Sequence, residues 1–155
     1  MHSLNGHQTV LAFDYGLRQM GVATGQTLTN SAQGLCILKA NDGVPNWDQI
    51  SKLLEEWKPD LVLVGLPLNM DASESELSRL ARKFARRLQG RFNINVLMVD
   101  ERLTSQDAKT LVRNENNEGK SGRMDVTKID HLAAALILQS WLDQPTLGKI
   151  GRAHV

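Results

Sequence analysis

Acidic residues stand at the ends of several apolar runs in this sequence. Asp14 ends the run TVLAFD, Asp100 and Glu101 end NVLMVDE, and Asp130 comes just before LAAALIL. Ionised carboxylates are rarely buried without a partner, so each of these positions needs a proton, a hydrogen-bond donor, an arginine or a metal ion nearby.

Carboxylates that meet at one point repel one another and stay ionised together only around a cation. Oxygen-only ligands select hard cations such as Mg²⁺ or Mn²⁺. Two such ions about 4 Å apart can activate a water molecule and stabilise the leaving oxygen when a phosphodiester is cleaved. Convergence of these acids would therefore support metal-dependent hydrolysis of a phosphodiester.

Two of the acidic positions have alternative interpretations. The spacing of Thr127 and Asp130 is also that of a capping box, in which Asp130 would serve the helix backbone. The two roles are compatible, because a helix N-terminus also favours an ionised carboxylate. Asp100 and Glu101 are neighbours at a strand end, where successive side chains point to opposite faces, so only one of them should face the cluster.

The elements that must position these acids form a predicted α/β fold. The order is three strands, a helix, a strand, a helix, a strand and then two helices, which implies a mixed five-stranded sheet flanked by helices. Open α/β sheets bind ligands beyond the carboxyl ends of their strands, so the first and last strands should bring their acids to one edge. The predicted strands are 9–14, 20–27, 34–39, 61–66 and 95–100, and residues 41–46 form a turn.

Capping signals place the predicted helices. Asn46 is an N-cap for a helix that Lys58-Pro59 ends, and Ser73 with Glu76 forms a capping box before a leucine stripe through Leu88. A further helix is predicted from Thr104 to Val112, a polar loop over 114–124, and a last helix from about 125 or 127 to 143.

The size and composition are those of one globular domain over residues 1–155, with a core of about 8–143 and short polar tails. No apolar run approaches the roughly 20 residues that a membrane helix needs. The first residues, MHSLNGHQ, are polar, and the single Cys36 excludes an internal disulfide, so we expect a cytoplasmic protein without membrane contact.

The basic residues suggest where a polyanion could bind. Arg18 lies in the first predicted turn and Arg102 directly follows the acids, where a phosphate contact competes with a solvated charge or with an ion pair to Asp100 or Asp14. Lys120 and Arg123, in the polar loop, are further candidates for contact with substrate. A charged helix face, which usually is only solvated, carries Arg79, Arg82, Lys83, Arg86, Arg87 and Arg91.

Four motifs in order resemble the YqgF/RuvX family over about residues 8–143: FDYG at 13–16, GLP at 65–67, DERLTS at 100–105 and DHLAAA at 130–135. Members of that family are called Holliday junction resolvases or pre-16S rRNA nucleases. The resemblance implies a ribonuclease H-like fold, with a five-stranded sheet whose first three strands are antiparallel. It also implies a catalytic and metal-binding triad on Asp14, Glu101 and Asp130, with Mg²⁺ or Mn²⁺.

The function that we expect from the residues and the resemblance together is that of a metal-dependent endonuclease acting on structured nucleic acid. The resemblance favours processing of the 5′ end of the ribosomal RNA precursor. Cleavage of four-way DNA junctions is the alternative, and it favours a two-fold homodimer over a monomer because both strands are cut symmetrically. A non-catalytic nucleic-acid-binding module is the second alternative.

A kinase function is disfavoured. Actin-like and sugar kinases, which share this ancestral fold, need two such domains, and this chain has one.

Overall fold

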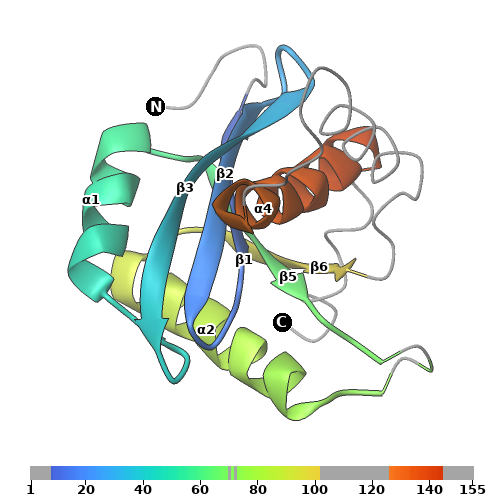
Figure 1. Cartoon of the computed structure of the whole chain (residues 1–155). Helices are drawn as coiled ribbons and strands as arrows, with labels where there is room; N and C mark the ends of the chain where they lie inside the picture. The colour runs from blue at the N-terminus through green and yellow to red at the C-terminus, as the bar shows by residue number, and fades with distance from the viewer. Residues whose placement is uncertain (1–7, 70, 72, 102–125, 145–155) are drawn as a thin grey trace.

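A computed structural model describes residues 8–69, 71, 73–101 and 126–144 of the chain. Its centre is a mixed sheet with the strand order β4-β3-β2-β1-β5-β6 (Figure 1). The strands are β1 (Thr9–Asp14), β2 (Gln19–Gln26), β3 (Ser31–Asn41), β4 (Val44–Pro45), β5 (Leu61–Leu66) and β6 (Val96–Asp100). The helices are α1 (Trp47–Trp57), α2 (Glu76–Phe92) and α4 (Val126–Asp143).

The pairing of the strands confirms the predicted mixed sheet. β1, β2, β3 and β4 pair antiparallel in sequence order, and β5 and β6 run parallel to β1. The described residues form a 6-stranded sheet, so the prediction of five strands was wrong by one. The additional strand, β4, lies where a turn was predicted, and a strand of 2 residues is too short to show alternation in the sequence.

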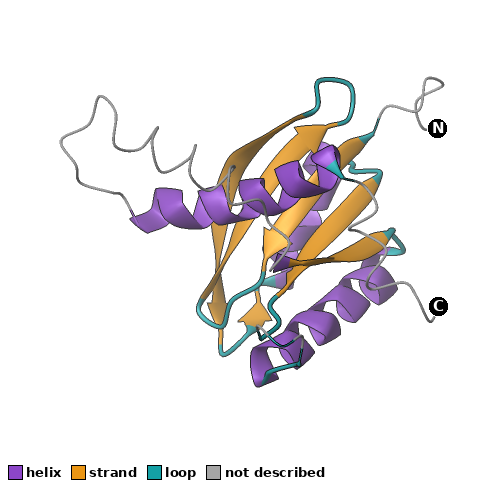
Figure 2. Cartoon of the chain, turned by 90° about the vertical axis from the view of Figure 1, so that its right-hand side faces the viewer, coloured by secondary structure: helices purple, strands orange, loops and turns teal. Residues whose placement is uncertain are grey.

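Helices cover both faces of the sheet. α1 and α2 lie against one face and α4 crosses the other (Figures 1 and 2). Two hydrophobic clusters fill the space between these layers, one under α1 and α2 and the other under α4. We call these two sides the α1/α2 face and the α4 face.

Alternation along β1 assigns its residues to the two faces. Val10 and Ala12 are buried in the cluster under α4, and Leu11 and Phe13 are buried in the cluster under α1 and α2. All six residues of β5 are buried, which is why its sequence, LVLVGL, is an unbroken apolar run.

The N-terminus of α1 is capped as predicted, because the Asn46 side chain accepts hydrogen bonds from the amides of Asp48 and Gln49 at 3.0 and 3.3 Å. The cap of α2 differs from the prediction. Ser75, not Ser73, is the N-cap, and it forms a reciprocal capping box with Ser78. Ser73 is instead held by Asp71, whose carboxylate accepts hydrogen bonds from the Ser73 amide at 3.0 Å and from its hydroxyl at 2.5 Å.

The last predicted helix is confirmed as α4, which begins at Val126 and ends at Asp143. The predicted helix at 104–112, the loop at 114–124 and the terminal tails lie outside the described residues. Among the helices that the structure describes, none combines the length and the apolar character that crossing a membrane would demand.

Candidate active site

Two of the three predicted acids lie at the same edge of the sheet and on the same face. Asp14 is the last residue of β1. Alternate residues of a strand point to the same face, so Asp14 points to the α4 face together with Val10 and Ala12. Glu101 directly follows β6, two residues after Val99, which is buried under α4. Both acids are partly exposed residues.

Gly65 on β5 lies between these acids and makes room for one of them. A Cβ atom at Gly65 would stand 2.6 Å from Oε2 of Glu101 and 2.7 Å from Cδ1 of Ile137. Real Cβ atoms essentially never make contacts that short, so a side chain at this position would displace the ends of the Glu101 and Ile137 side chains, whereas glycine leaves the Glu101 carboxylate in place against β5 beneath α4. Glu101 therefore lies on the α4 face, as Asp14 does.

The strand order fixes how far apart the two acids are. β5 is the neighbour of both β1 and β6, and Gly65 follows the register pair of Phe13 and Val64. Neighbouring strands lie about 4.8 Å apart, so the ends of β1 and β6 are separated by about 10 Å. Side chains that reach inward from both ends could share a cation over the edge of β5.

Asp100 lies on the opposite face of the sheet from Glu101. It is only 2% exposed and pairs with Leu66 in the β5–β6 register. Because side chains alternate along a strand, Asp100 shares a face with Met98, which belongs to the cluster under α1 and α2. The two adjacent acids thus serve different faces of the sheet.

The third predicted acid, Asp130, lies in α4, four residues before Ala134 and seven before Ile137. Ala134 and Ile137 are buried against the sheet, so the helix brings its buried stripe over the edge where Gly65 lies. The Asp130 side chain lies outside the described residues. Among the side chains that are described, no three His, Cys, Asp or Glu residues gather in a way that would hold a metal ion.

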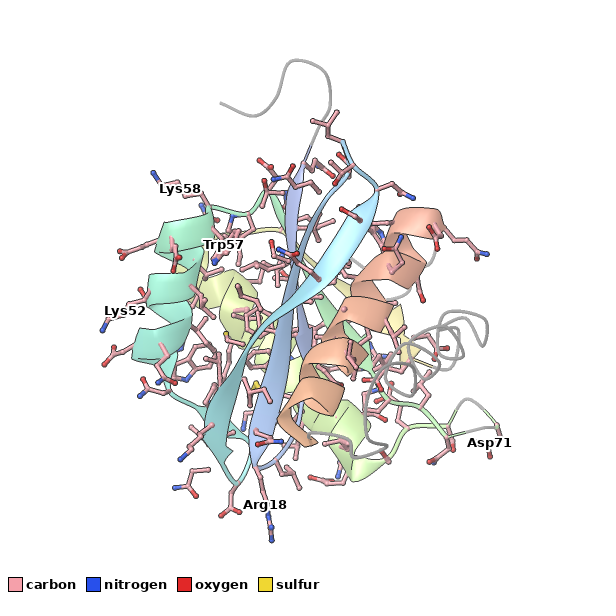
Figure 3. The ribbon with its side chains drawn as sticks, turned by 45° about the horizontal axis from the view of Figure 1, so that its top comes forward. Arg18, Lys52, Trp57, Lys58 and Asp71 are labelled. Atoms are coloured by element: carbon pink, nitrogen blue, oxygen red, sulfur yellow. The ribbon has the colours of Figure 1, made fainter. Side chains whose placement is uncertain are left out.

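The predicted substrate-binding residues are described only in part. Arg18 is exposed in the turn between β1 and β2 and points away from the molecule (Figure 3). Its backbone is anchored, because the Arg18 carbonyl accepts a hydrogen bond from the Ala40 amide at 2.7 Å. Arg102, Lys120 and Arg123 lie outside the described residues.

The role of Gly65 was not predicted as such. The sequence suggests only a strand end or a close approach of substrate at Gly65-Leu66-Pro67. A glycine inside an otherwise apolar strand is the signal that could have identified it, because such a residue marks a close approach by another group. Here the approaching group is a carboxylate of the same chain.

The arrangement of the strands and helices defines a class of fold that solved structures share. The Thermus thermophilus RuvC structure in complex with a Holliday junction substrate aligns with a TM-score of 0.57 at 15% identity, over 90% of this chain and 98% of that one. The fowlpox virus resolvase in complex with Holliday junction DNA gives 0.53 at 17% identity, over 88% and 98%. The fold is therefore the ribonuclease H-like fold of the junction resolvases.

The sequence comparison goes one step further, to a family. The model of the RuvX family, described as a Holliday junction resolvase, matches residues 8–144, and this chain belongs to that family. A relative from Pseudomonas fluorescens (strain Pf0-1) is 53% identical over 139 residues, which is 88% of this chain and 93% of the relative. One from Haemophilus influenzae (strain PittEE) is 51% identical over 135 residues, or 87% and 95%. Both carry the name "Putative pre-16S rRNA nuclease".

Proposed function

We propose that residues 8–143 form one metal-dependent endonuclease domain whose active site is built from Asp14, Glu101 and Asp130. The observation that carries the proposal is the glycine at position 65, which leaves space for the Glu101 carboxylate on the face that Asp14 shares. Two carboxylates that end neighbouring parts of the sheet on one partly exposed face can share a cation, which supports a metal site there.

The donor set fits a hard cation. Carboxylate oxygens from separate strands and a helix are the ligands that Mg²⁺ or Mn²⁺ prefers. A bound divalent ion supplies an activated water and stabilises the charge on the leaving oxygen. The protein's part is to aim the carboxylates of Asp14, Glu101 and Asp130 at one point and to hold the phosphodiester there.

The substrate that we propose is the 5′ end of the ribosomal RNA precursor, in the cytoplasm. Relatives above 50% identity carry a name that refers to pre-16S rRNA, and they match this chain over almost their full length. A four-way DNA junction is the second candidate, favoured by the family's description and by solved complexes with such DNA. A monomer suffices for the first substrate, and a homodimer would suit the second.

The test replaces Asp14→Asn, which keeps the side chain's shape and removes its charge. We expect cleavage to fall by at least about 100-fold, because the metal loses a ligand. Binding should survive or tighten, because repulsion of the phosphate is reduced. Asp48→Asn is the matched control, since Asp48 is an exposed acid in the first turn of α1 and should leave cleavage unchanged.

The assay offers ribosomal RNA precursor and four-way DNA junctions side by side, with Mn²⁺ and with chelator. Cleavage of one substrate that chelator abolishes would select between the two candidates. Undiminished cleavage by pure Asp14→Asn protein would contradict the proposed site. Binding by the wild-type protein with no cleavage under any condition would favour the non-catalytic module.

A further inference from the structure

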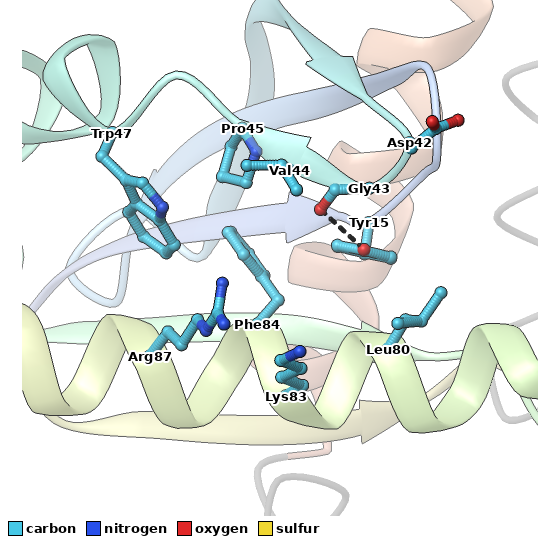
Figure 4. A pocket seen from close by; sticks show the side chains of 10 residues that line it. All are labelled: Tyr15, Asp42, Gly43, Val44, Pro45, Trp47, Leu80, Lys83, Phe84 and Arg87. Carbon is cyan, nitrogen blue, oxygen red and sulfur yellow. Dashed lines mark hydrogen bonds between the residues drawn. The ribbon is translucent and has the colours of Figure 1, made fainter.

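A pocket of about 100 Å³ lies on the face of the sheet opposite to the acids. It opens between α2, the first residue of α1 and the hairpin that joins β3 to β4 (Figure 4). Its walls are Tyr15, Asp42, Gly43, Val44, Pro45, Trp47, Leu80, Lys83, Phe84 and Arg87.

The pocket is held open by contacts between aromatic side chains and the hairpin. The Tyr15 hydroxyl donates a hydrogen bond of 2.8 Å to the Gly43 carbonyl. Gly43 has a φ of 85°, and a Cβ there would stand 2.3 Å from the Tyr15 hydroxyl oxygen. The rings of Trp47 and Phe84 stack with their centroids 5.8 Å apart. These contacts between residues of the chain define the shape of the pocket.

The charge of α2 is divided between its two halves. Near the N-terminus, Arg79 pairs with Glu76, and Arg82 pairs with Glu74 at 2.7 Å. Further along, Lys83 and Arg87 line the pocket, and neither forms an ion pair with any acid that the structure describes. The acid in the pocket wall, Asp42, is exposed on the hairpin, so the two cations leave the pocket with excess positive charge.

The cations continue beyond the pocket in a regular line. Arg91, four residues after Arg87, lies with its guanidinium carbon 4.4 Å from the centroid of the Trp47 ring. Steps of four residues advance about 6 Å along a helix. Lys83, Arg87 and Arg91 thus present positive charge at an interval similar to that between consecutive phosphates of a nucleic acid strand. We call these three residues the cation row.

The pocket and the acids share one edge of the sheet. Tyr15, in the pocket wall, directly follows Asp14, and the two belong to opposite faces. The turn after them is bound to the hairpin of the pocket, because the amide of Gly43 donates to the Leu17 carbonyl at 2.8 Å. A strand that passes over this turn, where Arg18 is exposed, would reach both faces.

We propose that the pocket and the cation row bind a second segment of the substrate's sugar–phosphate backbone, on the face opposite to the site of cleavage. This inference rests on the proposed function in one respect, that the substrate is a nucleic acid. Lys83 and Arg87 contact phosphates, and Val44, which is 51% exposed at the rim, packs against a sugar or base. The requirement for two separated contacts would select a branched or folded nucleic acid over a single short strand.

The experiment compares two double variants that each remove two positive charges from α2. Lys83→Gln with Arg87→Gln changes the cation row, and Arg79→Gln with Arg82→Gln changes the half that is already paired with acids. Binding of a fluorescent four-way DNA junction and a fluorescent RNA hairpin is measured by anisotropy in chelator at several salt concentrations. Thermal melts check that both variants fold.

We expect the cation-row variant to lower the slope of log affinity against log salt by about 1.4–1.8, because two phosphate contacts are lost at about 0.7–0.9 each. The control variant should keep the wild-type slope. Wild-type binding and cleavage with an unchanged slope in the cation-row variant would overturn the second contact and leave the proposed function standing. Wild-type protein that binds neither probe would overturn both proposals together.

Discussion

The two faces of the sheet differ in what they bring to the same edge. On the α4 face, small residues such as Gly65 and Ala134 let a helix approach closely, and acids end the strands. On the α1/α2 face, aromatic rings fill the space, and cations of α2 lie at the rim of a pocket. Strand alternation produces this contrast, since a shift of one residue moves a side chain to the other face.

The contrast teaches how adjacent residues can have unrelated roles. Asp14 and Tyr15 are neighbours in sequence, yet one faces α4 and the other holds the hairpin at Gly43. Asp100 and Glu101 divide in the same way at the end of β6. The separate roles of the two faces can be tested by changing residues of these two pairs.

The largest effect is expected from the pair at the end of β6. Glu101→Gln should reduce cleavage by at least about 100-fold with little loss of stability, because it removes a proposed metal ligand that is partly exposed. Asp100→Asn should leave the cleavage step nearly unchanged, because Asp100 faces α2. It should lower the free energy of unfolding by about 1–3 kcal/mol, because a carboxylate that is 2% exposed loses its interactions.

Single-turnover cleavage and urea denaturation of both variants measure the two effects separately. Loss of cleavage in Asp100→Asn together with full activity in Glu101→Gln would reverse the assignment of the two faces. Equal losses in both variants would show that the end of β6 acts as one unit rather than as two separate positions.

A smaller loss of activity is expected from Gly65→Ala. The added methyl group would lie 2.6 Å from the Glu101 carboxylate and 2.7 Å from Ile137, so the carboxylate must move. Displacement of a catalytic group by about 1 Å can reduce a rate by about 100-fold, and we expect a loss of about 10- to 100-fold in cleavage.

Gly90→Ala is the matched control for that variant. Gly90 lies in α2 with nothing within 4 Å of its would-be Cβ, so the same change there should raise stability by about 0.5–1 kcal/mol and leave cleavage alone. A Gly65→Ala protein that cleaves as well as Gly90→Ala would show that Glu101 needs no space at this edge.

The elements that carry a strong repeating pattern were predictable from the sequence. The unbroken apolar run predicts β5, and the amphipathic stripe predicts α2. Asn46 predicts the start of α1, because its side chain bonds to the backbone of the first turn. The acid at the end of β1 follows from strand order alone, because the carboxyl ends of parallel strands meet at one edge. These features depend on contacts between residues that are near in sequence or on simple topology.

Features that depend on distant contacts were missed or misplaced. β4 exists because two residues pair with the end of β3. The cap of α2 was misplaced for a different reason: Ser73 and Ser75 are both suitable cap residues, and the sequence does not show that Ser73 bonds to Asp71 while Ser75 bonds to Ser78. The pocket at Tyr15 requires a hairpin residue 28 positions away to accept its hydrogen bond. No local sequence pattern identifies a hydrogen-bond partner so far away along the chain. The pocket on the α1/α2 face was therefore not predicted from the sequence.

The smallest effect is expected from Tyr15→Phe, which alters the α1/α2 face without touching the acids. Loss of the hydrogen bond to the Gly43 carbonyl should lower the free energy of unfolding by about 0.5–1.5 kcal/mol at neutral pH. Cleavage should be unchanged at saturating substrate, because the acids on the α4 face keep their positions. A large loss of activity would mean that the two faces are coupled through β1.

The same variant has a distinctive dependence on pH. Burial raises the pKa of the Tyr15 phenol above 10.0, and the positive charge of Arg87 opposes part of that rise. Between the unfolded and the folded pKa, the unfolded chain loses the phenol proton first, so wild-type stability falls as pH rises through this range.

Phenylalanine has no such proton. The stability difference between the two proteins should therefore be constant below about pH 10 and shrink above it, as urea denaturation at several pH values would show. A difference that stayed constant to pH 11 would mean that the phenol ionises alike in both states, and that the hairpin does not enclose it.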